Sequence, residues 1–273
     1  MQKDASHLYL LSDMDDTLLS TDKSVCSRNR EAIARFQACG GHFSVATGRA
    51  PCTASHYLKG ILVNGPSVLI NGGLIYRFDT GETLFPHYMP PGYQQVVRQL
   101  AEHCPEVGIE VITQAGIHVA HYNEVIHRHI GAAGFEYFPC APDSLPEQAF
   151  KVLFGVVEPQ MEAFMELADS LPHAGLYFVR TFSEYYEMLP TGINKGMALG
   201  QLRSLLRPGD RLAAIGDYYN DVELLRQADI SFAVGNAPDD IKALAQRVTC
   251  TNNEGAVADA IDYLLQSLSL IHI

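Results

Sequence analysis

Basic side chains are scarce in this sequence. It has 19 Lys and Arg against 31 Asp and Glu, which gives a formal net charge of -12 at pH 7. Nucleic acid or an anionic membrane would need a basic face on its partner, so this composition argues against both. We therefore expect neither to be a principal partner. A small anionic ligand would need a local positive site together with a metal ion.

Paired cysteines and long apolar segments are also missing. The six cysteines are scattered, with no Cys-x-x-Cys pair and no spacing typical of zinc sites. This pattern predicts reduced thiols in a cytoplasmic protein. No apolar segment near the polar amino terminus is long enough for a signal peptide, and none in the chain predicts a membrane span. The chain shows no internal repeat.

Apolar residues are plentiful enough for a substantial core. They make up 47% of the 273 residues, which suits one large domain or two ordinary ones. The unbroken apolar run that begins at Leu8 is too short for a helix and is typical of a strand buried on both faces of a parallel sheet. It ends in three carboxylates, Asp13, Asp15 and Asp16. At the edge of a sheet, their repulsion is usually offset by a hard divalent cation such as Mg²⁺.

Strands and helices alternate at both ends of the chain. The pattern predicts strands at 42–46, 67–70, 211–215 and 230–234, a hairpin around Asp79-Thr80-Gly81, and helices at 24–39, from Pro51, and at 195–206, 220–227, 239–246 and 254–268. Between about 86 and 190 the pattern is instead typical of an α+β unit with an antiparallel sheet. That unit is predicted to have helices at 94–104, 124–133 and 160–171 and strands at 109–113, 117–122, 151–157, 176–180 and 185–189. We therefore expect an α/β fold with a second domain inserted into the first. Residues 269–273 are expected to fray.

Four polar clusters stand at strand ends or helix starts of the alternating part. The carboxyl ends of adjacent parallel strands face one crevice, so three clusters should converge there and the fourth should enter from a helix start. Two acids, a hydroxyl, a lysine and a second acid group are suited to phosphoryl transfer, which requires charge neutralisation and positioning. The clusters are Asp13 with Asp15, Thr47, Lys195, and Asp217 with Asn220 and Asp221.

In order and spacing, these clusters resemble the four motifs of the haloacid dehalogenase superfamily of phosphatases. The matching segments are Asp13-Met14-Asp15-Asp16-Thr17-Leu18, Thr47-Gly48-Arg49, Lys195-Gly196 and Gly216-Asp217-Tyr218-Tyr219-Asn220-Asp221. The insert resembles, in size and pattern, the cap of the Cof-type sugar-phosphatase branch. The resemblance implies a Rossmann-like parallel-sheet core over 1–85 and 190–273 and an inserted α+β cap domain over 86–189.

The resemblance also implies roles in catalysis. Asp13 would be the nucleophile that takes the phosphoryl group. Asp15 would protonate the leaving oxygen and then activate water. Thr47 would hydrogen-bond the transferring phosphoryl oxygens, and Lys195 would neutralise them together with the nucleophile.

A Mg²⁺ cofactor is implied in the same way. Asp217 would hold it together with the side chain of Asp13 and the main-chain carbonyl of Asp15, with Asn220 and Asp221 in or just behind that shell. Further contacts to the substrate are expected from residues in the second motif, from a glycine-rich turn and from the fourth motif. These substrate-binding candidates are Thr47, Gly48, Arg49, Asn71, Gly72, Lys195 and Asn220.

One residue departs from the family pattern, which usually has glycine where this chain has Asp16. Asp tolerates unusual turn dihedrals better than most residues, so we expect the turn to be kept. Its charge adds to the acidity near the metal. In the insert, Arg180 and Glu187 are candidates for substrate contact, and the spacing of its histidines and tyrosines fits no metal-ligand set.

The sequence thus predicts a Mg²⁺-dependent phosphatase acting on a small phosphorylated metabolite through an aspartyl phosphate. Sugar phosphates are the first substrate class on resemblance, followed by flavin or pyridoxal phosphate precursors. Two alternatives stay open: a phosphotransferase or hexose-phosphate mutase, and a non-catalytic phosphate-binding regulator.

Overall fold

The computed structural model describes residues 4–131 and 134–270, and its chain divides into two units. The core unit comprises the residues up to Arg49, Ala54–Phe85 and the residues from Asn194 onward. The cap unit comprises Ala50–Thr53 and Pro86–Ile193. The cap unit thus combines one long segment of the chain with the short segment Ala50–Thr53.

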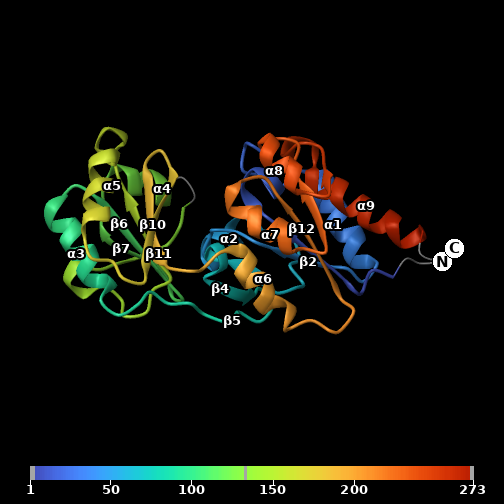
Figure 1. The fold of residues 1–273 in the computed structure, drawn as a ribbon, viewed down its shortest axis with the longest axis horizontal. Coiled ribbons are helices and arrows are strands. Elements are labelled where there is room, and N and C mark those ends of the chain that lie inside the picture. Colours follow the sequence, from blue (N-terminus) through green and yellow to red (C-terminus); the bar gives the residue numbers. More distant parts are fainter. Residues whose placement is uncertain (1–3, 132–133, 271–273) are drawn as a thin grey trace. The chain divides into compact units, whose positions relative to one another are not determined.

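The core unit is built on a five-stranded parallel sheet (Figure 1). Its strands are β1 (Leu8–Ser12), β2 (His42–Val45), β12 (Arg211–Gly216), β13 (Ile230–Ala233) and β14 (Arg247–Val248), in the order β14-β13-β12-β1-β2. Strand β1 lies between β12 and β2, so chain segments about two hundred residues apart in the sequence are neighbours in the sheet. This is the predicted α/β fold with a parallel sheet.

Helices cover both faces of this sheet. They are α1 (Ser27–Ala38), α6 (Lys195–Arg203), α7 (Val222–Gln227), α8 (Asp239–Leu244) and α9 (Ala256–Leu270), while the short helix α2 (Pro51–Tyr57) follows the loop after β2. Leu11 and Ala214 share a buried cluster with Leu199 of α6, Leu225 of α7 and Ile241 of α8. Alternate residues of each strand point to the opposite face of the sheet. On that face α9 packs against α1, and the ring of Tyr263 on α9 contacts Phe232 of β13.

A small antiparallel sheet extends the core unit. It consists of β3 (Ser67–Leu69), β4 (Leu74–Arg77) and β5 (Glu82–Leu84), and a parallel bridge between Ala46 and Val68 joins it to the end of β2. The hairpin expected around Asp79-Thr80-Gly81 is therefore confirmed as β4 and β5.

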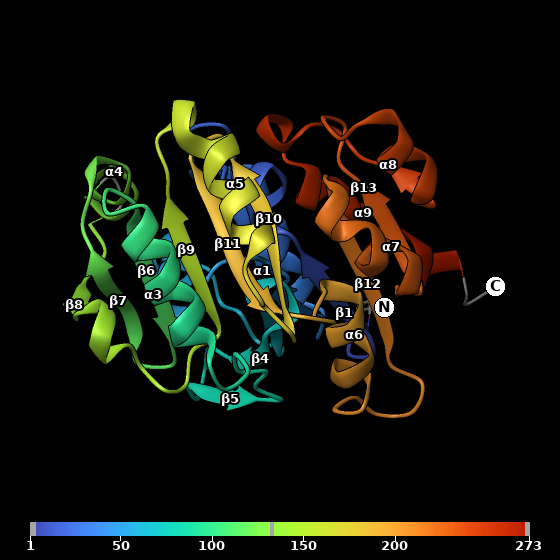
Figure 2. The same cartoon turned by 60° about the vertical axis from the view of Figure 1, so that its left-hand side comes forward.

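The cap unit has a six-stranded sheet in the order β10-β11-β9-β6-β7-β8. Its strands are β6 (Gly108–Thr113), β7 (Gly116–His121), β8 (Tyr137–Pro139), β9 (Lys151–Gly155), β10 (Leu176–Phe182) and β11 (Tyr185–Pro190), and its helices are α3 (Tyr93–His103), α4 (Glu124–Gly131) and α5 (Met161–Ser170). Helices α3 and α5 cover one face of the sheet (Figure 2), where Val97, Phe154, Phe164 and Met188 are buried together. All but the β7–β8 pair is antiparallel, as the α+β interpretation predicts.

Several expected boundaries were wrong. The third strand stops at Leu69 because Ile70 adopts a φ of +52°, outside the β region. Two short edge strands, β8 and β14, were missed, because their pairing is set by their neighbours and not by their own alternation. The helix expected at 124–133 ends in two residues that lie outside the described residues. Residues 271–273 of the expected frayed end also lie outside them. Helix α9 itself continues to Leu270.

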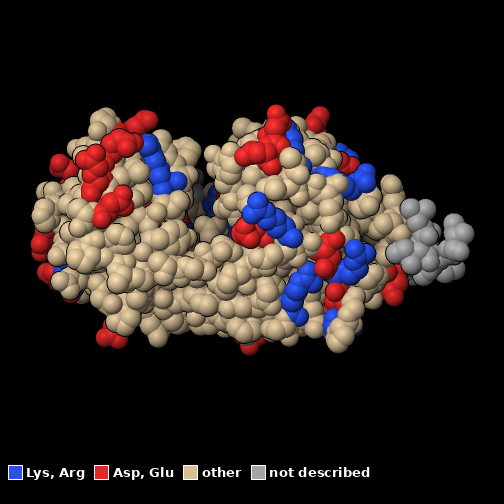
Figure 3. Space-filling model, in the orientation of Figure 1, with Lys and Arg blue, Asp and Glu red and all other residues tan. Residues whose placement is uncertain are grey.

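The surface agrees with the acidic composition. On the face drawn in Figure 3, acidic side chains occur on both units, and basic ones lie among acidic ones. All six cysteines are free thiols. Of the helices that the structure describes, none has both the length and the apolar character needed to cross a bilayer.

Candidate active site

Three of the predicted site residues follow three adjacent strands of the core sheet. Asp13 comes directly after β1, Thr47 lies two residues beyond β2, and Asp217 follows β12. The backbone continues the sheet's hydrogen bonding into these loops: Asp13 N donates to the Ile215 carbonyl oxygen at 2.9 Å, and Thr47 N donates to the Val68 carbonyl oxygen at 2.9 Å. The three side chains thus start from one edge of the sheet.

Lys195 is the first residue of α6, and its side chain reaches the same edge of the sheet. The side chain of Asn194 caps this helix by accepting from Met197 N at 2.7 Å, which fixes where the helix begins. The Lys195 ammonium is fully buried and donates to Asp13 Oδ1 and to Asp221 Oδ1, each at 2.6 Å. Burial alone would lower the pKa of Lys195, but the two carboxylates outweigh it and raise the pKa above its ordinary value.

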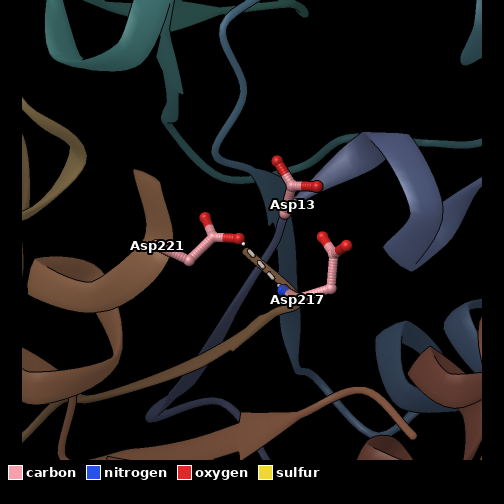
Figure 4. Close-up of side chains that lie close together, drawn as sticks. All are labelled: Asp13, Asp217 and Asp221. Carbon is pink, nitrogen blue, oxygen red and sulfur yellow. Dashed lines mark hydrogen bonds between the residues drawn. The ribbon is translucent and has the colours of Figure 1, made fainter. Parts of the chain in front are cut away.

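Asp13, Asp217 and Asp221 form a compact carboxylate cluster. Each offers an oxygen within 4.8 Å of the others (Figure 4). Burial, followed by the charges of Asp221 and Asp217, raises the pKa of Asp13 well above its ordinary value despite Lys195. Burial and the charge of Asp221 raise the pKa of Asp217 to about 7. One Lys195 ammonium does not balance the negative charge of three carboxylates. Carboxylate oxygens are the ligands that a hard divalent cation prefers, so this cluster could hold one.

Asp221 also shapes the loop that carries Asp217. Its Oδ2 accepts from the backbone N–H groups of Asp217 at 3.0 Å and Tyr218 at 3.3 Å. A Cβ on Gly216 would lie 2.5 Å from that oxygen, so the close approach requires glycine. Both oxygens of Asp221 are therefore engaged, Oδ1 by Lys195 and Oδ2 by the backbone of the loop that carries Asp217. Thr17, to which the sequence analysis gave no role, donates to Asp217 Oδ1 at 3.0 Å; its place in the first motif was the available signal.

Asp15 points to a different set of partners. Its carboxylate accepts from Arg49 Nε at 2.8 Å, Arg49 Nη2 at 2.7 Å and Lys23 Nζ at 3.1 Å. Burial would raise the pKa of Asp15, but the hydrogen bonds and charge of Arg49, helped by Lys23, hold it below its ordinary value. Asp16 adopts the left-handed conformation, φ +55°, that glycine enters freely, so the turn is kept as expected. Asn236 fixes this turn by donating to the Asp16 carbonyl oxygen at 2.9 Å.

Asn71 links two of the other motifs. Its backbone N–H donates to the Thr47 carbonyl oxygen at 3.0 Å, and its side-chain Oδ1 accepts from Asn220 Nδ2 at 3.4 Å. A Cβ on Gly48 would lie 3.0 Å from the Asn71 amide nitrogen, so this side chain packs directly on the second motif. Both Ile70 and Asn71 have positive φ, a conformation that is rare for a β-branched residue such as Ile70. Asn220 is exposed.

Gly72 continues this unusual turn with a φ of +101°. A Cβ at this position would lie 2.3 Å from the backbone carbonyl oxygen of Asn194, directly before Lys195. The turn after β3 therefore packs against the start of the helix that delivers the lysine.

The two candidates in the insert lie in the cap unit and have partners of their own. Arg180 on β10 pairs with Glu162 at 3.1 Å and donates to nearby backbone carbonyls, while the buried Glu187 on β11 pairs with Lys151 at 2.7 Å. Among the described residues, His, Cys, Asp and Glu side chains lie close enough together to hold a metal ion in the carboxylate cluster of the core unit and nowhere in the cap unit.

Comparisons with known proteins show the family of this chain. The family model for haloacid dehalogenase-like hydrolases matches residues 10–261, as the resemblance to the Cof-type branch predicts. A Bacillus subtilis relative named 5-amino-6-(5-phospho-D-ribitylamino)uracil phosphatase is 26% identical, covering 92% of this chain and 95% of its own. The pyridoxal phosphate phosphatase of Escherichia coli is 25% identical, covering 91% and 95%. A solved haloacid dehalogenase-like hydrolase from Bacteroides thetaiotaomicron is 23% identical, superimposes with a TM-score of 0.85 and covers 94% of this chain and 98% of its own, which shows the shared fold.

Proposed function

Because this chain belongs to the haloacid dehalogenase-like hydrolases, we propose that it is a Mg²⁺-dependent phosphatase that hydrolyses a small phosphorylated metabolite through an Asp13 phosphoenzyme. The observation that carries the proposal is the buried Lys195 ammonium held between Asp13 and Asp221, beside Asp217. With Asp13 as the nucleophile, this contact would supply a fixed positive charge beside it. Phosphoryl transfer requires such positioning and charge stabilisation.

In the first half of the reaction, a carboxylate oxygen of Asp13 attacks phosphorus and the bond from phosphorus to the leaving oxygen breaks. Asp15 gives a proton to that oxygen, so the leaving group departs as an alcohol. This step requires Asp15 to be protonated in the substrate complex, whereas in the free protein burial is outweighed by Arg49 and Lys23, which hold its pKa below the ordinary value. Lys195, which already contacts Asp13 Oδ1, offsets negative charge on the nucleophile and the phosphoryl group. The Thr47 hydroxyl lies at the same sheet edge and supplies a hydrogen bond to the phosphoryl oxygens.

In the second half, water attacks the aspartyl phosphate. Asp15, now ionised, accepts the proton from this water as the bond between phosphorus and Asp13 breaks. Inorganic phosphate leaves, and both carboxyl groups return to their starting protonation states.

Mg²⁺ is the proposed cofactor because the donor set consists of carboxylate oxygens. Asp13 and Asp217 would hold it, with Asp221 supporting the loop behind them. When bound, the ion supplies positive charge that neutralises the phosphoryl oxygens.

The substrate is proposed at the level of its class. The two named relatives act, by their names, on a ribitylamino phosphate and on pyridoxal phosphate, two metabolites of different chemistry. Sugar phosphates stand first among the candidates, with flavin and pyridoxal phosphate precursors next. The acidic surface gives no support to a nucleic acid substrate.

The test is phosphate release from a panel of sugar phosphates, the ribitylamino phosphate, flavin mononucleotide, pyridoxal phosphate and nucleotides, with Mg²⁺ and with chelator. We expect release that needs Mg²⁺ and falls by roughly 10³-fold or more in Asp13→Asn, since the nucleophile is lost. Asp239→Asn, which removes a fully exposed carboxylate on α8, serves as the matched control. Isomerised sugar phosphate in place of free phosphate would favour a mutase. No turnover of any compound would overturn the proposal.

A further inference from the structure

A fourth strand of the core sheet also leads to a polar side chain at the edge that carries the site. Strand β13 lies next to β12, and Asn236 follows three residues beyond the end of β13. Val234 N donates to the Gly216 carbonyl oxygen at 3.1 Å, so this loop leaves the sheet beside the loop that carries Asp217. No step of the proposed reaction uses Asn236.

The Asn236 side chain joins two loops of the core unit. Its Nδ2 donates to the Asp16 carbonyl oxygen at 2.9 Å, and its Oδ1 accepts from Asn252 N at 3.0 Å. One end of the amide is therefore fixed by the loop before α9, and the other end holds the turn that follows Asp13. The buried Asn252 in turn donates through its Nδ2 to the Leu19 carbonyl oxygen at 3.1 Å.

The turn that follows Asp13 depends on such outside contacts. Asp16 adopts a left-handed conformation, φ +55° and ψ +15°, directly after the extended Asp15. A left-handed conformation is unfavourable for a residue with a Cβ, and it persists where surrounding contacts hold it. The backbone hydrogen bond that spans the turn, from Leu18 N to the Asp13 carbonyl oxygen, is long at 3.3 Å. The contact with Asn236 therefore supports a conformation that Asp16 does not favour by itself.

The residues on either side of Asp16 reach the carboxylate cluster. Asp13 belongs to the cluster, and Thr17 Oγ1 donates to Asp217 Oδ1 at 3.0 Å. The carbonyl of Asp16 and the N–H of Thr17 share one planar peptide group, so a shift of that carbonyl moves Thr17 directly. The amide of Asn236 is thus connected, through one turn, to two of the three cluster carboxylates.

We infer that Asn236 is a positioning residue for the metal site. By holding the Asp16 carbonyl, it keeps the side chains of Asp13 and Asp217 at the spacing that lets them bind one cation. It acts through the turn and is not itself a metal ligand. This inference rests on the proposed function, in which these two carboxylates hold Mg²⁺. Outer hydrogen-bonding partners that orient metal ligands change metal affinity when they are removed.

Asn253 offers a matched control. Its Oδ1 accepts from Thr21 N at 3.0 Å, and its Nδ2 donates to Thr21 Oγ1 at 3.0 Å. Like Asn236, Asn253 is exposed and uses both ends of its amide. Thr21, however, lies four residues beyond Thr17, outside the turn. Loss of the Asn253 amide should therefore leave the carboxylates in place.

The first measurement is Mg²⁺ binding to the metal-free protein by titration calorimetry, without substrate. Asn236→Ala should raise the dissociation constant by roughly tenfold or more, because the turn no longer holds the ligands in place. Asn253→Ala should change it by less than about twofold. Urea unfolding of both variants in chelator shows how much general stability each has lost.

Replacing Asp16 by glycine tests the role of the turn. Glycine adopts a left-handed conformation without steric cost, so the turn in Asp16→Gly should depend less on the amide. In that background, Asn236→Ala should raise the Mg²⁺ dissociation constant by less than about threefold. The same factor in both backgrounds would mean that Asn236 does not act through this turn.

Hydrogen exchange tests the turn without any metal. In chelator, the amides of residues 14–19 should exchange roughly tenfold faster in Asn236→Ala than in the wild type. They should exchange at the wild-type rate in Asn253→Ala. Asn236→Ser, whose hydroxyl is too short to join both loops, replaces Asn236→Ala in each experiment if the alanine variant does not fold.

An unchanged Mg²⁺ dissociation constant in Asn236→Ala, or an equal rise in Asn253→Ala, would overturn the inference. A wild-type protein that binds no Mg²⁺ would contradict the proposed function and, with it, the metal role of Asn236. The exchange rates would still decide whether Asn236 holds the turn.

Discussion

At the scale of single residues, the site holds more buried negative charge than positive charge. Lys195 offsets Asp13 and Asp221, but Asp217 has only the Thr17 hydroxyl as a direct side-chain partner among the contacts described above. The raised pKa values of Asp13 and Asp217 express that imbalance. A cation would remove it, which links metal binding to stability.

Asp217 should make the metal-free protein less stable as pH rises. Its folded-state pKa of about 7 lies above the ordinary value of 3.8, so protonation favours the folded state. This stabilisation is complete below the ordinary pKa and is lost as pH rises through about 7. Between about pH 6 and about pH 8, the free energy of unfolding in chelator should therefore fall by on the order of 1 kcal/mol more in the wild type than in Asp217→Asn.

Urea unfolding at both pH values measures this difference, with Asp239→Asn as the control that should keep the wild-type pH dependence. Mg²⁺ should stabilise the wild type more at the higher pH and should stabilise Asp217→Asn much less. Equal pH dependence in wild type and Asp217→Asn would show that Asp217 is not the group responsible.

At the scale of elements, the turn after β3 organises the loops around the site. Asn71 contacts the second motif and Asn220, while Gly72 packs on the residue before Lys195. Positive φ is costly at Ile70 and Asn71, and such conformations persist where surrounding contacts hold them in place. The turn therefore couples the position of α6 to that of the second motif.

Gly72→Ala should disrupt this coupling. The new Cβ would lie 2.3 Å from the Asn194 carbonyl oxygen and would also disfavour φ +101°. We expect a loss of roughly 2–5 kcal/mol in the free energy of unfolding, together with a fall in kcat from displacement of Lys195. Gly209→Ala is the matched control, because Gly209 has φ +95° but open space around its Cβ position.

Gly209→Ala should lower the free energy of unfolding only by the cost of a positive φ for alanine, roughly 1–2 kcal/mol, and its kcat should equal that of the wild type. Thermal or urea unfolding and steady-state kinetics on the same samples measure both effects. Similar losses in the two variants would mean that the contact with Asn194 is unimportant.

At the scale of the whole molecule, the insert has a hydrophobic core of its own. The cluster between the cap sheet and helices α3 and α5 draws its buried members from Met89 to Met188, all within the insert. A domain of this size can bury enough apolar surface to fold alone. Insertion into the core chain therefore does not require the two cores to form together.

A fragment spanning residues 86–193 should fold by itself. We expect dispersed amide signals in NMR spectra and a cooperative thermal transition, because its sheet and both covering helices are contained in the fragment. Phe154→Ala removes a fully buried ring and should lower its stability by roughly 3–5 kcal/mol. A disordered or aggregated wild-type fragment would show that the insert depends on the rest of the chain.

Much of the fold and part of the site follow from the sequence alone. Short apolar runs alternating with amphipathic segments specify a parallel sheet, and the carboxyl ends of its adjacent strands must share one edge. Asp13, Thr47 and Asp217 were predicted to meet for this reason, and the strand order confirms that they lie on adjacent strands. The haloacid dehalogenase resemblance is confirmed by the family match.

Most side-chain partners were decided only by the tertiary structure. The family resemblance implied that Lys195 lies beside Asp13, but the pairing of Arg49 with Asp15 depends on which way two loops turn beyond the sheet. Local sequence patterns specify periodicity and strand ends, but the direction of a side chain in a loop depends on long-range packing. The sequence therefore determined which residues reach the sheet edge, and the tertiary structure decided that Asp15 faces Arg49 while Asp221 faces Lys195.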